Sequence, residues 1–571
     1  MAKLIAWFKD IDSNNSHEVG ESLAKLGELY SSNFPVNLGF VITTSAFDEF
    51  SNANGLCKKL ADITSQARLN DSNSILEASK RATELIMNAT VPAYVQDRVL
   101  SAYHNLETGG ERFAALNSTA YAMISAGRAR TPQVQITSSL CSEATRGYSF
   151  GGTRKTISNI QGDEALVHAL KRAWSALYEP QAIYYFKKHG FHEGSIAVCV
   201  QKMVDEEQSG IAFSTNPLTQ EKEVVVEAIW GWARPLEEGT ITPDSYTVGP
   251  EHLQVVERKI NRQEWLLTRD LRTMKETKKE LSTERSNSAV LTDDVIKRVA
   301  HLAKKVERHF LKSHFIRFCV ISNRVYLTGV HELLPPRSQG SAELQSGMQK
   351  VASGVSVSQG SATGTLRIAG TADALFSLPA DTVLAVKTLS PKLIAHLENI
   401  VGIASLHGGL GSELAILARE LAKPIVTQST DFTSLDENDT ILLDTQSASL
   451  YSVQTPAPPL ESHNSFENAF PAPSFLDTEQ NMTQPLPAQP STEPSFVPKP
   501  LSPLLATKPT SSALTVGFSS AEGIFLQELI ALCTRFGVNM HIATTKKEES
   551  KLTPQPQEEQ ASKNQQFMPF W

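Results

Sequence analysis

The sequence has no run of about 18 consecutive apolar residues, the length that a membrane-spanning helix needs. Its first residues, Met1 to Phe8, form only a short apolar patch, which is followed by Asp10 and Asp12. This patch is too short for the hydrophobic region of a secretory signal, and no small-residue cleavage site follows it. We therefore expect the chain to begin with folded structure and to work in the cytoplasm, with no membrane partner.

The sequence also has few cysteines and no excess of positive charge. The five cysteines, at positions 57, 141, 199, 319 and 533, form no CxxC pair, so neither a zinc site nor a disulfide framework is indicated, and we predict no metal-ligating set. The 53 basic residues are outnumbered by 61 acidic ones, which gives a net charge of −8. This balance argues against nucleic acid or an anionic membrane as the main partner.

The length of 571 residues predicts two to four domains, at roughly 100–200 residues per domain. Up to about residue 335, helical and strand patterns alternate without a low-complexity break. Apolar periodicity predicts helices over 16–29, 163–186 and 291–310. Runs rich in β-branched residues predict strands over 40–44, 195–204 and 223–229.

The texture changes after residue 345. Short strands alternate with glycines over 354–370. A strand is predicted over 382–386, a helix near 391–397, a Gly-rich turn into a helix over 413–421, and a further strand that opens at Pro424.

The last part of the chain has a different composition again. Residues 456–512 are rich in Pro, Ser and Thr with few large apolar side chains, which predicts a disordered linker. Residues 513–545 regain a strand–helix–strand pattern, a small βαβ unit that is too short to be a domain alone. The tail, 546–571, is charged and Gln-rich. We expect that residues 456–571 contact a protein partner, if the chain has one.

Several motifs follow one another in an order that resembles a known family. HEVGESLAKLGEL (17–29) precedes PVNLGFVITT (35–44), and SSLCSEATRGYSFGG (138–152) precedes QKMVDEEQSGIAFSTNP (201–217). Further on stand GVSVSQGSATG (354–364), VKTLSPKL (386–393) and GGLGSELAILARELAKPIV (408–426). Together they resemble the phosphoenolpyruvate synthase and pyruvate phosphate dikinase family over most of residues 1–455. Each motif alone is a weak signal, and their order and spacing carry the resemblance.

The resemblance implies a multidomain mixed α/β (α+β and α/β) protein. An ATP-grasp domain is expected at 1–338 and a swivelling β/β/α domain of the phosphohistidine type at 345–455. In this family the first domain transfers a phosphoryl group from ATP, with Mg²⁺, to a histidine of the second. The histidine then carries it to a third, barrel-shaped domain, where pyruvate accepts it. The resemblance therefore implies ATP and Mg²⁺ as cofactors.

At several positions the sequence departs from the family pattern. Ser22 stands where the resemblance places a lysine, Thr137 where it places an arginine, and Arg234 where it places a glutamate. Arg317 replaces a glutamate expected to contact metal or ribose, and the closing glutamine and arginine are Gly329 and His331. Gly152, Thr156, Gln201 and Glu227 keep the pattern and are the candidate nucleotide-binding residues.

The largest departure lies in the second domain, where Glu413 replaces the phosphate-accepting histidine. A carboxylate can in principle form an acyl phosphate, and His407, six residues upstream, is an alternative acceptor. Both readings are weaker than a structural role for these two side chains. A (β/α)8 barrel needs about 200 residues or more, and the residues after 455 are too few for one.

Three hypotheses follow. The first is a degenerate member of the family, a pseudoenzyme with a binding or regulatory role. The second is an active ATP-dependent phosphotransferase with an altered acceptor. The third is a half-enzyme that pairs with a separate barrel subunit, which Glu413 disfavours because nothing would carry the phosphate.

Overall fold

The computed structural model describes residues 3–106, 131–141, 153–191, 194–270, 272–337, 348–370, 375, 378–429 and 435–453. The chain divides into two compact units, residues 1–463 and 464–571, and every described residue belongs to the first. The predicted linker, the βαβ unit at 513–545 and the tail therefore lie outside the described residues. Within the described part, no helix is both long and apolar enough to cross a membrane.

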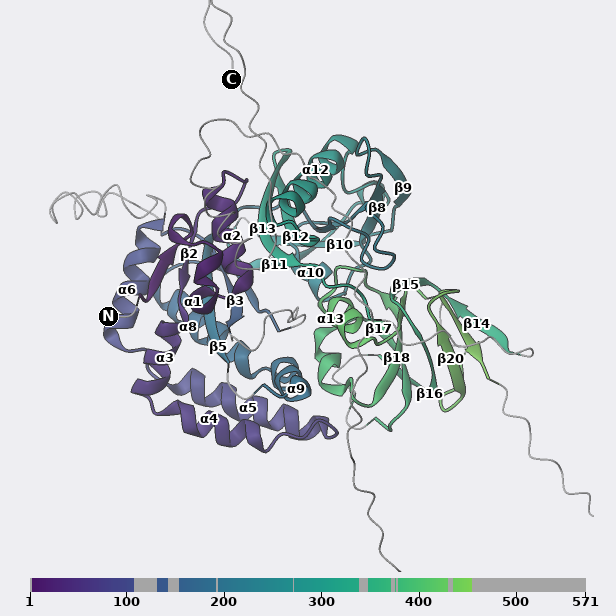
Figure 1. Ribbon diagram of the computed structural model, residues 1–571, viewed down its shortest axis with the longest axis horizontal. Helices are drawn as coiled ribbons and strands as arrows, with labels where there is room; N and C mark the ends of the chain where they lie inside the picture. Colours follow the sequence, from purple (N-terminus) through teal and green to yellow (C-terminus); the bar gives the residue numbers. More distant parts are fainter. Residues whose placement is uncertain are drawn as a thin grey trace, which may run out of the picture. The chain divides into compact units, whose positions relative to one another are not determined.

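The first sheet is antiparallel throughout, with described strands in the order β1-β2-β5-β3-β4. These strands are β1 (Ile5–Trp7), β2 (Gly39–Ile42), β3 (Val134–Cys141), β4 (Thr156–Ile160) and β5 (Ser195–Lys202). The helices of this region are α1 (Ser16–Val19), α2 (Glu21–Ser31), α3 (Thr44–Ala53), α4 (Leu56–Ser65), α5 (Ser72–Asn88), α6 (Ala93–His104), α8 (Asp163–Trp174) and α9 (Pro180–His189). Helix α8 packs on the sheet, and α5 packs on α8 and α4 (Figure 1).

Two predicted helices are interrupted. The helix expected over 16–29 divides at Gly20, whose φ of +82° is incompatible with a continuous helix. The single helix expected over 163–186 is wrong: α8 ends at Trp174, a 3₁₀ turn (Ser175–Tyr178) follows, and α9 starts at Pro180. Proline has no N–H to donate and fits only the first turn of a helix, so the apolar periodicity continues while the helix does not.

The second sheet is also antiparallel, with described strands in the order β13-β12-β6-β7-β8-β9. Its strands are β6 (Gln208–Phe213), β7 (Val224–Trp230), β8 (Asp244–Val248), β9 (Val255–Lys259), β12 (His314–Ile321) and β13 (Arg324–Glu332). The short helices α10 (Arg234–Glu237) and α11 (Thr283–Ser286) and the hairpin of β10 (Trp265–Arg269) with β11 (Glu276–Glu280) complete this region.

Helix α12 (Asp293–Phe310) covers the second sheet. The side chain of Thr292 caps the N-terminus of this helix by accepting a hydrogen bond from the Val295 N–H. Acidic residues occupy the first turn and basic residues the last, an arrangement that the helix dipole favours. Its apolar face joins a core cluster that includes side chains from both the first and second sheets. These two sheets therefore share one core, as one domain does.

The third sheet is mixed, with described strands in the order β14-β21-β20-β16-β17-β18-β19-β15. Its strands are β14 (Gln349–Ser353), β15 (Val355–Ser358), β16 (Ser361–Ala369), β17 (Thr382–Thr388), β18 (Ile400–His407), β19 (Ile425–Thr427), β20 (Thr440–Asp444) and β21 (Ser449–Ser452). The neighbours from β16 to β19 are parallel. Helix α13 (Glu413–Leu421) has the predicted bounds, and the turn Pro391–His396 (η7) is a 3₁₀ helix.

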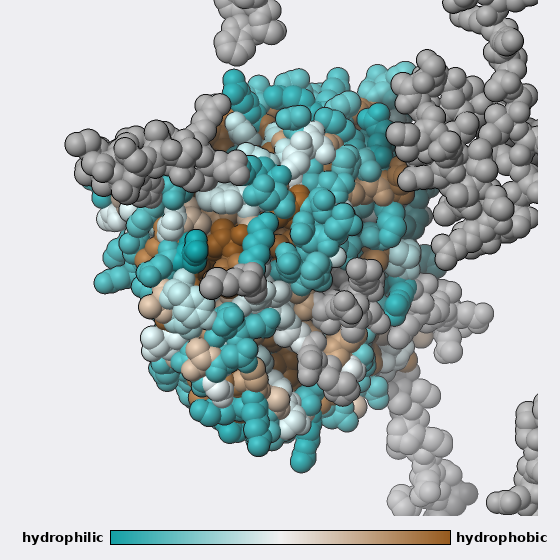
Figure 2. All heavy atoms as spheres, turned by 60° about the vertical axis from the view of Figure 1, so that its left-hand side comes forward, coloured by the Kyte–Doolittle hydropathy of each residue, from teal (hydrophilic) through white to brown (hydrophobic). Residues whose placement is uncertain are grey.

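The region of the third sheet packs against the first two. Helix α9 contacts η7, and one core cluster includes side chains of α9, η7 and α13 together with strands β5 and β6. Hydrophilic residues dominate the face shown in Figure 2, and hydrophobic residues are visible mainly in recesses between them.

Candidate functional site

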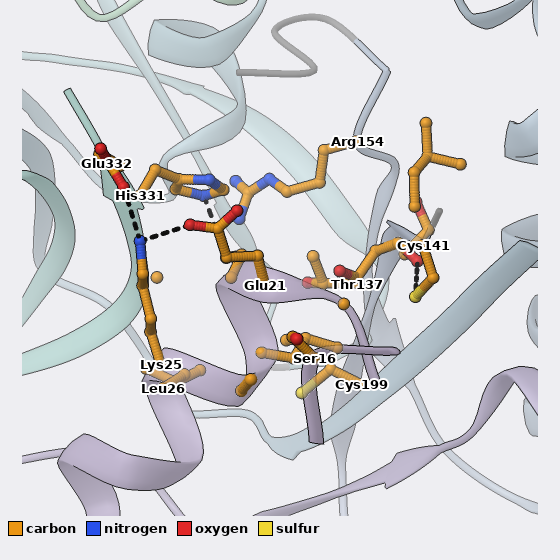
Figure 3. A pocket seen from close by; sticks show the side chains of 18 of the residues that line it. Ser16, Glu21, Lys25, Leu26, Thr137, Cys141, Arg154, Cys199, His331 and Glu332 are labelled. Carbon is orange, nitrogen blue, oxygen red and sulfur yellow. Dashed lines mark hydrogen bonds and ion pairs between the residues drawn. The ribbon is translucent and has the colours of Figure 1, made fainter. Parts of the chain in front are cut away.

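A cavity of about 460 Å³ lies between helices α1 and α2, strand β3 and strand β13 (Figure 3). The turn between the two helices is pressed against β3. At Gly20, which joins them, a Cβ would stand 2.2 Å from Ser139 Oγ. The positive φ and this close approach both require glycine, and they place the first turn of α2 at the cavity wall.

Four positions that depart from the family pattern line this cavity together: Ser22, Thr137, Gly329 and His331. Ser22 Oγ donates to the Val330 carbonyl at 2.9 Å and lies 3.4 Å from His331 Nε2. Burial, and the guanidinium groups of Arg154 and Arg317, hold the pKa of His331 well below its usual range. The imidazole is therefore neutral, and these four residues bring no fixed charge to the wall.

The charged residues at one end of the cavity largely neutralise one another. Lys25 points toward both Glu21 and Glu332 (Figure 3), with Nζ 2.6 Å from the former and 3.4 Å from the latter. Lys312 Nζ lies 2.8 Å from Glu332. Two lysines thus face two glutamates, and this end offers little net charge to an anionic ligand.

The four residues that keep the family pattern do not gather in one place. Gln201 lines the cavity, and its Nε2 donates to the Asn37 carbonyl at 3.1 Å. Thr156 opens strand β4, and its buried hydroxyl has no hydrogen-bond partner within the described part of the chain. Glu227 is buried on β7 and bonds to the loop before α13. Gly152 lies outside the described residues.

A buried cluster of four charged side chains, Arg154, Glu237, Arg317 and Glu413, forms beside the cavity. Arg317 Nη1 lies 2.8 Å from Glu237 Oε1, and Arg317 Nη2 lies 2.5 Å from Glu413 Oε1. Arg154, which also lines the cavity, pairs with the same oxygen of Glu237. The side chains of Arg317 and Glu413 are only 4% and 8% exposed. We call these four residues the charge cluster, and its formal charges sum to zero.

Electrostatics keep the carboxyl of Glu237 ionised. Burial opposes ionisation of Glu237, but Arg154 and Arg317 outweigh it and hold the pKa of its carboxyl below the ordinary value. Burial, and then repulsion by Arg317, lowers the pKa of Arg154. Nearby Glu206 behaves in the opposite way, since burial and the charge of Glu237 raise its pKa to about 8. Glu237 is therefore the carboxylate that the arginines stabilise.

Glu413, the replacement for the expected histidine, is the first residue of α13, after the Ser412 cap. Residues 408–412, which we call the docking loop, lie against the second sheet. The backbone N–H groups of Leu410 and Gly411 donate to the two carboxylate oxygens of Glu227, at 2.8 and 2.7 Å. Burial raises the pKa of Glu227 to about 7, against the lowering effect of these two bonds.

His407, the alternative acceptor, is the last residue of β18. Its Nδ1 lies 3.3 Å from Thr242 Oγ1. Burial, and then the charge of Lys387, lowers its pKa. No bond between His407 and the charge cluster is found in the described part of the chain.

The remaining departure from the family pattern is Arg234, the first residue of α10. Its side chain forms an ion pair with Glu276 of β11.

The described residues do not fit a magnesium ion at this site. Magnesium needs oxygen ligands, but both carboxylates of the charge cluster are bonded to guanidinium groups. The described ranges contain no group of three His, Cys, Asp or Glu side chains that could hold a metal ion. For ATP the fit is partial, because Arg154 and Gln201 line the cavity while Ser22 and Thr137 replace the expected cations.

Two residues of the charge cluster, Arg154 and Glu237, were not singled out from the sequence. Arg154 lies two residues after the glycine pair 151–152, within the run Arg154-Lys155, so two cations close to a candidate phosphate loop were an available signal. Glu237 had no comparable signal, because its importance depends on the arginines that approach it from β12 and from residue 154.

Two family models match the chain. The model "Pyruvate phosphate dikinase, AMP/ATP-binding domain" matches residues 16–328, which is more than half of the chain. The model "PEP-utilising enzyme, mobile domain" matches residues 378–448. The first match covers most of the region of the first two sheets, and the second covers the part of the third sheet from β17 to β20.

Curated relatives agree with these matches. A "probable phosphoenolpyruvate synthase" of Archaeoglobus fulgidus is 28% identical over 74% of this chain and 54% of its own length. One of Methanocaldococcus jannaschii is 27% identical over 72% of this chain and 33% of its own. A "phosphoenolpyruvate synthase" of Aeropyrum pernix is 28% identical over 76% and 56%. The chain thus spans about half the length of several of the curated relatives it matches, and a third of one of them.

Proposed function

Because the chain belongs to the pyruvate phosphate dikinase and phosphoenolpyruvate synthase family, we propose that it is a degenerate member with a binding or regulatory role. It keeps an ATP-grasp-type nucleotide-binding domain and a docked mobile domain, and it does not transfer a phosphoryl group to a histidine. One observation carries the proposal. At the position of the expected phosphate acceptor stands Glu413, and its carboxylate is ion-paired with Arg317.

The chemistry supports this reading. A phosphate acceptor must present a lone pair to the phosphorus atom, and a neutral imidazole does so well. The Glu413 carboxylate is instead directed at a guanidinium group 2.5 Å away, which lowers its availability for attack. Arg317 adds a fixed cation where the resemblance implies a metal-contacting glutamate. A divalent ion would be repelled there rather than bound.

The direct test is incubation of the full chain with ATP labelled in both the β- and the γ-phosphate, with and without Mg²⁺, because a dikinase that forms AMP leaves the β-phosphate on its acceptor. We expect no covalent label on the protein, whereas the Aeropyrum pernix relative, treated in parallel, serves as the comparison. Label that is stable to base and lost in acid, as phosphohistidine is, would contradict the proposal. So would label released by hydroxylamine, which is the signature of an acyl phosphate.

The second candidate is an active phosphotransferase with an altered acceptor. The observation in its favour is the lowered pKa of His407, which keeps this imidazole neutral and therefore nucleophilic near pH 7. If label does appear, His407→Ala and Glu413→Ala variants locate it. Loss in only one of them identifies the acceptor.

The cavity is the expected ligand site in either case. Calorimetric titration with ATP and with a non-hydrolysable analogue measures whether a nucleotide still binds. A protein partner for residues 456–571 and a cytoplasmic location stay predictions from the sequence.

A further inference from the structure

The two most unusual departures from the family pattern contact each other. Arg317 belongs to β12 of the second sheet, and Glu413 to the start of α13 beside the third sheet. Arg317 brings a buried positive charge to this site and Glu413 a buried negative one, and burial of a charge is costly unless an opposite charge compensates it. Together they form a buried ion pair of 2.5 Å between the nucleotide-binding region and the mobile domain.

We propose that Arg317 and Glu413 form a latch that keeps the mobile domain docked on the nucleotide-binding region. The inference concerns domain movement rather than chemistry, so it does not depend on the proposed function. In place of a metal ion and a phosphoryl group, the chain supplies a fixed cation and a fixed anion of its own. A contact that would otherwise form and break with ligand is thereby made permanent.

The docking loop supports the latch with a second set of bonds. Glu227 receives both the Leu410 and the Gly411 N–H, so its two oxygens are committed to the mobile domain. Glycine is required for this approach. A Cβ on Gly409 would stand 2.6 Å from Glu227 Oε1, and one on Gly411 would stand 2.4 Å from Ile211 Cγ2. The loop thus fits the second sheet without room for a side chain at either position.

Helix α9 adds a third contact. It reaches α13 near its C-terminal end, away from Glu413 at the start of that helix. Tyr185 donates a hydrogen bond of 2.5 Å to Glu420, which is buried on α13. Lys188 forms an ion pair of 2.8 Å with Glu398. Unlike the latch, the Lys188–Glu398 pair is about one third exposed, so solvent weakens it. The Lys188–Glu398 pair is therefore a matched control. It crosses the same boundary but should contribute little to the docking of the mobile domain.

The latch is the contact most sensitive to loss of one partner. If Glu413 becomes neutral, Arg317 shares Glu237 with Arg154, and the charge cluster carries an uncompensated positive charge. Separation of the domains then hydrates that charge. If both partners are neutralised, Arg154 and Glu237 remain as a balanced pair, so a double variant should be no worse than either single one.

The test is the distance between spin labels on Cys57 and on an introduced cysteine at position 350, measured by double electron–electron resonance in the full chain. Cys57 is exposed, whereas Cys141, Cys199 and Cys319 are buried. Lys350 is exposed on β14, and Lys350→Cys gives the second site. Cys533→Ser removes the remaining thiol. We expect one narrow distance distribution, unchanged by ATP with Mg²⁺.

The variants then test the latch itself. Glu413→Gln and Arg317→Met should each lower the ratio of docked to undocked molecules at least tenfold, and the double variant should undock no further than either. Lys188→Gln should leave the distribution narrow. Gly411→Ala keeps both charges but adds a Cβ at the contact, so it should also undock the domain, and it remains informative if a charge variant does not fold. The proposal would be overturned by a broad distance distribution in the protein that keeps both Arg317 and Glu413. It would also be overturned by narrow distance distributions in both charge variants.

Discussion

The cavity wall and the charge cluster lie side by side and have changed in opposite directions. At the wall, uncharged side chains stand where the resemblance implies cations: Ser22, Thr137 and the neutral His331. In the charge cluster, two arginines and two glutamates are buried together with every charge paired. This contrast is the basis of our proposals that the wall binds an anionic ligand weakly and that the charge cluster holds the mobile domain in one position.

The largest expected effect comes from opening the charge cluster. Glu413→Ala should lower the free energy of unfolding by about 3–5 kcal/mol, because it leaves Arg317 buried with too few counter-charges. Denaturant titration followed by fluorescence measures this. Lys188→Ala removes half of an ion pair that is one third exposed and should cost about 1 kcal/mol or less. Equal losses of unfolding free energy in the two variants would contradict the claim that the buried Arg317–Glu413 pair matters more than the partly exposed Lys188–Glu398 pair.

A second effect concerns the pH dependence of the docking loop. The folded pKa of Glu227, about 7, lies above its ordinary value of 4.5. Between these values the folded protein holds a proton that the unfolded chain has released, so this group makes stability fall as pH rises through that window. A shift of this size corresponds to about 3 kcal/mol.

Glu227→Gln should remove that slope, which stability measurements at pH 5, 6 and 7 would detect. Glu251→Gln, at an exposed turn, is the matched control and should keep the slope of the unmodified protein. An unchanged slope in Glu227→Gln would mean that this carboxyl is not the group that titrates.

The smallest effect is expected at the cavity wall. Ser22→Lys returns the cation that the resemblance implies and should strengthen ATP binding by about tenfold, the value of roughly one charge-assisted hydrogen bond. Calorimetry measures the affinity. Ser22→Met has a long but uncharged side chain and should give no gain. If both variants bind ATP as the parent does, the wall is not a phosphate site.

Much of the fold was predictable because its signals are local. The bounds of α13 and the C-terminal end of α12 were correct, since Ser412 caps the start of α13 and the apolar periodicity stops where each of the two helices ends. The helix over 163–186 was wrong because Pro180 interrupts a pattern that continues on both sides of it. The family itself was confirmed, because motif order carries information that no single motif does.

The site was only half predictable. The departures at Ser22, Thr137, Gly329 and His331 were named from the sequence, and the structure brings them to one cavity. The pairing of Arg317 with Glu413 was not predicted, since 96 residues separate them and only docking of the mobile domain brings them together. From the sequence, each replacement indicated only the loss of a family residue, whereas in the structure the two side chains form an ion pair.

The most direct test of the central claim is the back-replacement Glu413→His, assayed for phosphohistidine after incubation with labelled ATP and Mg²⁺. The account predicts no label, because the restored histidine faces Arg317 at a site that does not fit a magnesium ion. Formation of phosphohistidine in this single variant would contradict the account, since it would show that the nucleotide side of the site still works and that only the acceptor was lost.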